Sequence, residues 1–239
     1  MKLLGLDTAT TTAGIALVDA SDGIRVLGCA RHDTSGRGAD LLVKIDELCR
    51  AAGVAPAALG AVAIGAGPGS FTGLRIGMAT GKGIAFAAGR PLWAVSSLAA
   101  LADDALRELA IPDPGVICAA LDARRGEVFA GCFRAGIALG PERVLAPGEL
   151  AAWVAEAAAP HEPVSFAGDA LDAHRAILAP LAAQHRWLAA RTPSGLAVAR
   201  LALAGARVDI TVGGAPVYIR PSEAEVMYPD GVPGALPRR

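Results

Sequence analysis

The residues best suited to chemistry lie near the amino end, in the segment LLGLDTATTTAGIALVD, residues 3–19. An apolar run ends at Asp7, and the hydroxyl-rich stretch Thr8–Thr12 leads into a second apolar run. A strand that ends in a carboxylate and continues into hydroxyls can hold a phosphate group and Mg²⁺. The same residues also suit an ordinary turn, because Asp and Thr are common there. The pattern is thus compatible both with a nucleotide site at Asp7 and Thr8 and with an ordinary turn.

A second candidate is the stretch GAGPGSFTGLRIGMATGKG, residues 65–83. Its first three glycines, with Pro68 among them, predict a tight strand-to-helix turn. The amides at the start of the helix could hold an anion, so Gly67 and Gly69 join the candidate contacts of a degenerate nucleotide site. The stretch matches neither GxxxxGK[ST] nor GxGxxG, and a specific phosphate-binding motif is therefore missing.

Three glycines, Gly73, Gly77 and Gly81, follow at four-residue spacing along the predicted helix. They leave one helix face bare of side chains, and each costs about 1 kcal/mol of helix stability relative to Ala. We therefore expect another backbone to pack against this row. The pattern leaves open whether that backbone is the chain's own helix near 40–52 or a helix of another protein. An apolar stripe that should meet the core runs beside the row: Phe71, Leu74 and Met78.

Other catalytic arrangements find no support in motif spacing. The four histidines form no HxxxH or HxxH pair, so a metal site is unsupported and each histidine is expected at the surface. The four cysteines show no CxxC spacing and are expected to be buried, reduced thiols. Cys118 and Cys132 lie on neighbouring predicted strands, which leaves a disulfide open. No Ser/His/Asp or Cys/His set can be assembled.

Composition narrows the class of protein. The 239 residues are 53% hydrophobic and 19% charged, which is typical of a globular chain. The net charge of −1 argues against a protein that holds RNA or an anionic membrane unaided. No apolar run approaches the roughly 18 residues of a membrane span. The first residues are expected to form a strand and not a signal peptide, so we expect a cytoplasmic protein.

The candidate residues require an α/β framework to position them. Periodicity and turn residues predict strands at 3–7, 14–19, 24–30, 61–65, 91–95, 116–122, 127–134 and 216–220. They predict helices at 40–52, from 71 to about 89 with Ser70 as cap, from 96 or 97 to 109, and at 149–159, 170–183 and 194–206. The sequence PDPG at 112–115 suggests a boundary, giving subdomains 1–111 and 112–220 and a mobile tail, 221–239.

Four segments together resemble the bacterial TsaB (YeaZ) family: LGLDTATTTAGIALVD, GAGPGSFTGLRIGMATGKGIA, LDARRGEVFAGCF and PVYIR. These matches cover residues 1–135 and a patch at 216–220, and GPGSFTGLRIG is highly specific. Residues 140–210 carry no matching motif. Family members usually have a histidine before the first helix, but residues 36–40, GRGAD, lack it. Any role of that histidine does not carry over to this chain.

The resemblance implies an ASKHA fold, with two related mixed-sheet halves in the style of actin and sugar kinases. It implies a non-catalytic partner of the transferase TsaD. With the ATPase TsaE, that complex transfers threonylcarbamoyl to the adenosine beside the anticodon of certain tRNAs. It further implies a homodimer in the absence of TsaD, only indirect contact with tRNA, and no membrane. No cofactor is required, although ATP or ADP with Mg²⁺ could be held weakly at the subunit interface.

The resemblance also implies that the first two helices form the surface that pairs with TsaD. Carried over by position, that surface comprises Gly69, Phe71, Gly73, Leu74, Gly77, Met78, Gly81, Leu41 and Ile45. A non-catalytic role agrees with the second half of the chain. An active phosphate clamp needs a second acidic turn with hydroxyls, but AlaArgArgGly follows Asp122.

Two other functions remain open on the sequence. One is an autonomous ASKHA kinase or phosphotransferase that uses Asp7 and the Thr8–Thr12 turn. The other is a homodimeric scaffold for an unrelated client.

Overall fold

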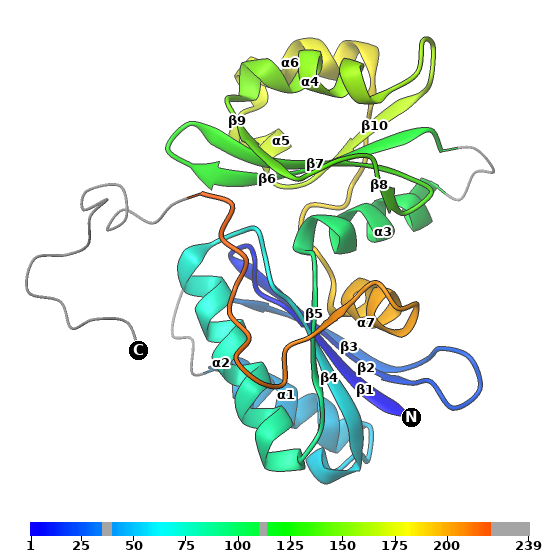
Figure 1. Ribbon diagram of the computed structural model, residues 1–239, viewed down its shortest axis with the longest axis vertical. Coiled ribbons are helices and arrows are strands. Elements are labelled where there is room, and N and C mark those ends of the chain that lie inside the picture. Colours follow the sequence, from blue (N-terminus) through cyan, green and yellow to red (C-terminus); the bar gives the residue numbers. More distant parts are fainter. Residues whose placement is uncertain (35–39, 110–113, 221–239) are drawn as a thin grey trace, which may run out of the picture.

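The computed structural model describes residues 1–34, 40–109 and 114–220. These residues form two lobes, each built on a six-stranded β-sheet, and Figure 1 shows one lobe above the other. Both sheets contain parallel and antiparallel neighbours, so the predicted α/β fold class is confirmed.

The sheet of the first lobe has the strand order β12-β5-β4-β1-β2-β3. Its strands are β1 (Lys2–Asp7), β2 (Thr12–Asp19), β3 (Arg25–Asp33), β4 (Leu59–Gly65), β5 (Leu92–Val95) and β12 (Val208–Asp209). Helices α1 (Asp40–Ala51) and α2 (Phe71–Ala88) cover one face, and α7 (Gly195–Leu203) covers the other. A short 3-10 helix, Pro56–Ala58, precedes β4.

The sheet of the second lobe has the order β11-β10-β6-β7-β8, with β9 also paired to β7. Its strands are β6 (Val116–Arg124), β7 (Glu127–Arg134), β8 (Ile137–Ala138), β9 (Arg143–Leu145), β10 (Val164–Ala167) and β11 (Arg186–Trp187). Its helices are α4 (Leu150–Ala157), preceded by a 3-10 turn at Pro147–Glu149, α5 (Ala170–Ala173) and α6 (Arg175–Gln184). Helix α3 (Ser97–Leu109) lies between the two lobes in Figure 1.

The two sheets repeat one pattern. In each, a hairpin (β1–β2 or β6–β7) pairs antiparallel, and a later strand (β4 or β10) adds in parallel to the first strand of that hairpin. The predicted pair of related mixed-sheet halves is therefore confirmed.

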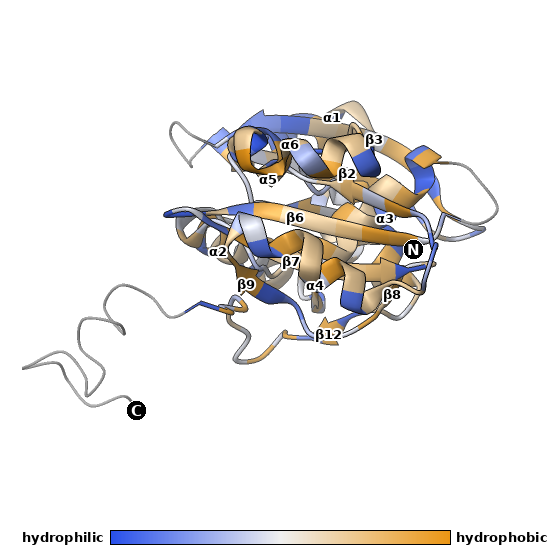
Figure 2. Ribbon diagram, turned by 90° about the horizontal axis from the view of Figure 1, so that it is seen from above, coloured by the Kyte–Doolittle hydropathy of each residue, from blue (hydrophilic) through white to orange (hydrophobic). Residues whose placement is uncertain are grey.

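Apolar side chains alternate along the strands and pack against helices on both faces of each sheet. In β1, Leu4 and Leu6 belong to the core under α1 and α2, whereas Leu3 packs with α7. In β6, Ile117 packs on the side of α3 and Cys118 on the side of α4 and α6. Figure 2 shows β6 as apolar along most of its length, as expected for a strand that is buried on both faces.

The predicted domain limits need correction. Helix α7 packs on β1 and β2, and β12 pairs with β5 through Val208–Ala94 and Asp209–Trp93. The chain therefore crosses into the second lobe after α3 and returns to the first at α7. Subdomain 112–220 is thus not one unit. The predicted tail 221–239 and the segment that lacks the family histidine, 36–39, lie outside the described residues.

Local signals in the sequence predicted most helices and strands correctly, and most differences from the structure fall late in the chain. Ser70 caps α2 by accepting a hydrogen bond from the Gly73 amide, and the helix ends at Gly89, which has a φ of 62°. The helix predicted at 170–183 divides at His174 into α5 and α6. Residues 216–220 are not a strand, and β10 was not predicted. Among the described residues, no helix is long and apolar enough to cross a membrane.

Candidate functional site

Asp7 lies at the end of β1 but does not face an open site. Its side chain is fully buried, and its carboxylate accepts hydrogen bonds from the Ser97 hydroxyl at 2.7 Å and the Ala9 amide at 2.8 Å. Burial raises the pKa of Asp7 to about 6, although these hydrogen bonds oppose the shift. The carboxylate joins the end of β1 to the start of α3. A nucleotide cannot reach it in this arrangement, contrary to the prediction.

Thr8 is buried as well, and its hydroxyl has no hydrogen-bond partner within the described residues. A Cβ atom on Gly77 of α2 would lie 2.1 Å from this hydroxyl. Thr8 is thus a packing residue beneath α2, and its predicted role as a nucleotide contact also needs correction.

Gly67 and Gly69 allow close approach of three chain segments. Gly67 has a φ of 116°, and a Cβ atom there would lie 2.6 Å from the Val217 carbonyl oxygen. A Cβ atom on Gly69 would lie 2.5 Å from the Cβ atom of Ala9. Gly69 lines a cleft between the lobes, so it is the member of the predicted nucleotide set that faces open space.

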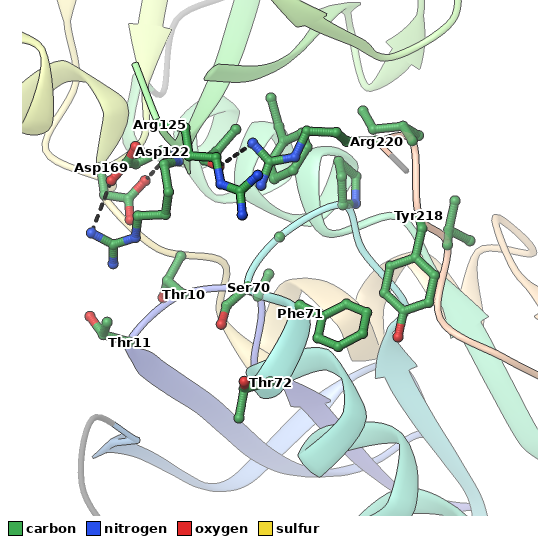
Figure 3. A pocket seen from close by; sticks show the side chains of 18 of the residues that line it. Thr10, Thr11, Ser70, Phe71, Thr72, Asp122, Arg125, Asp169, Tyr218 and Arg220 are labelled. Carbon is green, nitrogen blue, oxygen red and sulfur yellow. Dashed lines mark hydrogen bonds and ion pairs between the residues drawn. The ribbon is translucent and has the colours of Figure 1, made fainter. Parts of the chain in front are cut away.

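The interlobe cleft has a volume of about 620 Å³. Figure 3 shows its labelled side chains arriving from both lobes. The floor comes from the β1–β2 turn and the start of α2, the roof from the β6–β7 turn and Asp169, and one wall from an extended segment. Its lining residues are Ala9, Thr10, Thr11, Pro68, Gly69, Ser70, Phe71, Thr72, Arg75, Asp122, Ala123, Arg124, Arg125, Phe129, Asp169, Val217, Tyr218, Ile219 and Arg220.

The acidic residues of the roof are bound to their own neighbours. Asp122 accepts hydrogen bonds from the Arg124 amide at 2.9 Å and lies 3.3 Å from His174 Nε2. Asp169 accepts a hydrogen bond from the Asp122 amide at 2.8 Å. Burial raises the pKa of Asp169 to about 6. His174 is therefore half-buried beside a carboxylate, and its predicted surface location is wrong.

The extended wall of the cleft is the segment 216–220, the PVYIR stretch. The Val217 amide donates to the Ala66 carbonyl, and the Tyr218 ring lies 5.1 Å from the Phe71 ring. Arg220 donates to the Ala123 carbonyl at 2.7 Å in the other lobe. This segment therefore bridges the two lobes along one side of the cleft.

The row of glycines on α2 packs against the chain's own residues. A Cβ atom on Gly73 would overlap the Thr8 carbonyl oxygen, and one on Gly77 would overlap the Thr8 hydroxyl. A Cβ atom on Gly81 would lie 2.7 Å from Ile64 Cγ2 of β4. The prediction that the row receives another chain is wrong. So is the alternative that it packs against the helix at 40–52, because the β1–β2 turn and the sheet fill it.

The apolar members of the predicted interface are also mostly internal. Four of them are buried in the core beneath the helices: Leu41, Ile45, Leu74 and Met78. Phe71 is 40% exposed, but it lies at the cleft beside Tyr218. Whether any of these residues contacts a partner stays a prediction.

An apolar groove does run between α1 and α2, at a different place. It has a volume of about 800 Å³ and is lined by Leu42, Val43, Ile45, Asp46, Cys49, Pro56, Leu59, Ala79, Thr80, Gly83, Ile84 and Ala87. A Cβ atom on Gly83 would meet nothing within 4 Å. Leu42 is 56% exposed, Val43 is 53% exposed, and Phe86 on α2 is 90% exposed.

A sequence signal for this groove was present but unused. On α1, Leu41, Ile45 and Cys49 occupy the buried face, so the apolar pair Leu42 and Val43 is surplus to the core. On α2, Gly83 departs from the four-residue glycine spacing and therefore cannot share the buried face.

The prediction that all four cysteines are buried, reduced thiols is confirmed only in part. Cys118 and Cys132 are register partners on β6 and β7, both are buried, and both are free thiols. Cys49 is buried as predicted, whereas Cys29 is exposed, contrary to the prediction. Among the described residues, no three His, Cys, Asp or Glu side chains group closely enough to hold a metal ion.

Comparisons with known proteins agree with the fold. The family model described as TsaD, tRNA N6-adenosine threonylcarbamoyltransferase, matches residues 39–214. A solved structure of YeaZ from Pseudomonas aeruginosa superposes with a TM-score of 0.71 and 31% identity, covering 91% of this chain and all of that one. This likeness confirms the predicted ASKHA-type architecture.

Relatives with similar sequences carry names that state a biological process. The tRNA threonylcarbamoyladenosine biosynthesis protein TsaB of Bacillus subtilis is 28% identical over 95% of this chain and 98% of its own length. The protein of the same name from Haemophilus influenzae is 34% identical over 54% of this chain. That match spans about half the length of the Haemophilus protein.

Proposed function

Because the chain belongs to the TsaB (YeaZ) family, which takes part in tRNA threonylcarbamoyladenosine biosynthesis, we propose that it is a non-catalytic subunit that binds a TsaD-like transferase. The contact surface in this proposal is the groove between α1 and α2. A helix of the transferase subunit occupies the groove and covers the exposed side chains at its rim.

The observation that carries this proposal is the exposed apolar surface of the groove. Leu42 and Val43 line the groove and are exposed to solvent, although the core beneath α1 and α2 is already filled. Phe86, which is also on α2 but not in the groove lining, is exposed as well. Contiguous exposed apolar surface typically marks a site of protein association. The open space beyond Gly83 allows a partner's side chain to approach the backbone of α2.

The non-catalytic part of the proposal is supported by the state of Asp7. A kinase of this fold needs a strand-ending carboxylate that can reach Mg²⁺ and phosphate. Here Asp7 is buried and hydrogen-bonded to Ser97 and Ala9. We therefore expect no Mg²⁺-dependent ATP turnover by the purified chain. Turnover that disappears in an Asp7→Asn variant would instead favour the kinase.

The remaining expectations of the family resemblance form part of the same proposal. The complex also includes a TsaE-like ATPase, and tRNA is contacted mainly through the transferase subunit. Two copies of this chain pair through the same groove when the transferase is absent. The protein acts in the cytoplasm and requires no cofactor, although ATP or ADP with Mg²⁺ is held weakly at the subunit interface.

Size-exclusion chromatography with light scattering tests the proposal. The chain is mixed with the TsaD-like protein of the same organism, and we expect a stable complex. A Leu42→Asp, Val43→Asp double variant should stay folded but elute separately, because two charges would be buried in an apolar contact. An Ile177→Asp control alters an equally exposed residue on α6 and should bind normally. Loss of binding in the control, or normal binding by the double variant, would refute the proposed surface.

A further inference from the structure

The chain segments that connect the two lobes differ in their position relative to the interlobe cleft. Helix α3 and residues 188–194, which carry the chain between the lobes, contribute no residue to the described lining of the cleft. The segment 216–220 does line it, through Val217, Tyr218, Ile219 and Arg220. In Figure 1 this segment rises beside α2, to the left of α3, toward the second lobe. It therefore joins the lobes at the cleft itself.

The start of the segment is bound to the first lobe through its backbone. The Val217 amide donates a hydrogen bond to the Ala66 carbonyl, directly after β4, at 2.7 Å. A Cβ atom on Gly67 would lie 2.6 Å from the Val217 carbonyl oxygen, so glycine permits this close approach of the two backbones. Just before the segment, the Gly214 carbonyl accepts a hydrogen bond from Lys82 of α2. Contacts with both β4 and α2 thus fix this end.

Tyr218 adds side-chain contacts to the same lobe. Its hydroxyl accepts a hydrogen bond from Arg75 Nε at 3.3 Å, and its ring centroid lies 5.1 Å from that of Phe71. The Arg75 Cζ atom lies 3.8 Å from the Phe71 ring centroid. The three side chains therefore form one group at the start of α2, held by aromatic and cation–π contacts as well as by the hydrogen bond.

The far end of the segment is bound to the second lobe through Arg220. Its Nη1 atom donates to the Ala123 carbonyl at 2.7 Å and to the Glu127 carboxylate at 2.9 Å, so it contacts both strands of the β6–β7 hairpin. Its Cζ atom lies 5.8 Å from the Phe129 ring centroid. Ile219, one residue earlier, packs against the apolar cluster that contains Phe129. The segment thus reaches across from one lobe to the other.

The two ends differ in how easily they separate from their lobes. The first-lobe end combines backbone hydrogen bonding with ring packing. At the other end, the side chains of Arg220 and Glu127 are 29% and 41% exposed. An ion pair with this exposure contributes little net free energy, because water solvates both charges when they separate. We therefore expect the contact with the second lobe to be released first.

We propose that the segment 216–220 is an interlobe latch, which fixes the separation of the lobes and opens at Arg220. With the latch closed, the two lobes move as one body. When Arg220 leaves the hairpin, the remaining connections run through α3 and the residues next to it, and the lobes rotate about them. A few residues at the ends of elements can absorb such a rotation. The latch contributes no residue to the described lining of the α1–α2 groove and does not depend on the accessory role proposed above.

Double electron–electron resonance on the full chain tests the latch. One spin label is attached to the exposed thiol of Cys29 on β3, and the other at an Ala155→Cys substitution on the exposed face of α4. The other three native cysteines are buried and should stay unlabelled. Adding Arg220→Gln should widen the distribution of distances between the labels, because the lobes then sample several separations. A distribution of unchanged width would overturn the proposal.

Arg175→Gln is the matched control in the same labelled chain. Arg175 pairs with Asp172 at 2.8 Å within the second lobe, so its replacement removes an ion pair without touching a contact between the lobes. We expect the distribution to keep its original width. Widening equal to that of Arg220→Gln would show a general loss of packing and would contradict the assignment to the latch.

Amide hydrogen exchange measured by NMR identifies the end that opens. In the Arg220→Gln variant, the Val217 amide should keep its protection, because its hydrogen bond to Ala66 lies on the first lobe. Retained protection together with a wider distance distribution is the result that the latch predicts. Loss of that protection would show that the segment leaves the first lobe as well, and would overturn Arg220 as the point of release.

Discussion

The Asp7 carboxylate lies fully buried between the end of β1 and the start of α3. Burial raises its pKa to about 6, from 3.8 in the unfolded chain. The folded protein therefore binds this proton more tightly than the unfolded chain does. Stability from this group is greatest in acid and falls as the pH rises from about 4 to about 6.

The pH dependence of an Asp7→Asn variant follows from this shift. Between pH 4 and 7, the free energy of unfolding of the wild type should fall by up to about 3 kcal/mol relative to that of the variant. Urea unfolding at several pH values measures the difference. Parallel pH profiles for the two proteins would show that Asp7 titrates normally.

Two glycines of α2, Gly73 and Gly83, provide a second test through single substitutions. Gly73→Ala should lower the free energy of unfolding by about 1–3 kcal/mol, because its Cβ atom overlaps the Thr8 backbone carbonyl. Gly83→Ala should raise it by up to about 1 kcal/mol, because space is open there and Ala favours the helix. Thermal and urea unfolding compare the pair. Equal effects of the two changes would contradict the packing described for α2.

Gly77 and Gly83 differ in their suitability for testing partner contact. A side chain added at Gly77 would overlap Thr8, so Gly77→Leu would disturb the fold itself. Gly83 is the glycine whose substitution alters the surface and spares the core.

At the scale of elements, local signals in the sequence were sufficient for α1, α2 and the two hairpins. Ser70 and Gly89 set the ends of α2 through hydrogen bonds and backbone conformation within a few residues. The spacing of the glycines also revealed a close backbone contact. It did not reveal what makes that contact, because Thr8 reaches the row only through the pairing of β1 with β4.

Elements that depend on distant partners were predicted poorly. Strand β10 has only four residues and is fixed by parallel pairing with β6. The segment 216–220 has the apolar residues of a strand, but it crosses between the lobes and pairs with no strand in the described chain. Short segments of this kind take their conformation from the tertiary structure.

At the scale of the whole molecule, the return of α7 to the first sheet sets the arrangement of the lobes. Packing of α7 on β1 and β2 brings the chain after it along α2, where Lys82 donates to the Gly214 carbonyl. The same path carries residues 217–220 into the cleft. Composition and periodicity contain no signal for this path, so the sequence predicted neither the cleft's wall nor the correct domain limits.

The molecule thus has two open sites with different chemistry. The α1–α2 groove is mainly apolar, whereas the interlobe cleft is lined by arginines, aspartates and hydroxyl groups. The proposed contact with a transferase subunit depends on the groove, whereas the cleft has no part in it.

The affinity of a Gly83→Leu variant for the TsaD-like subunit tests that role most directly. Leu should fill the open space in the groove without entering the core, and Gly148→Leu adds the same side chain at an open position of the second lobe as a control. Titration calorimetry should show affinity at least about tenfold weaker for Gly83→Leu, with undiminished stability, and wild-type affinity for the control. Wild-type affinity in a folded Gly83→Leu protein would contradict docking at this groove.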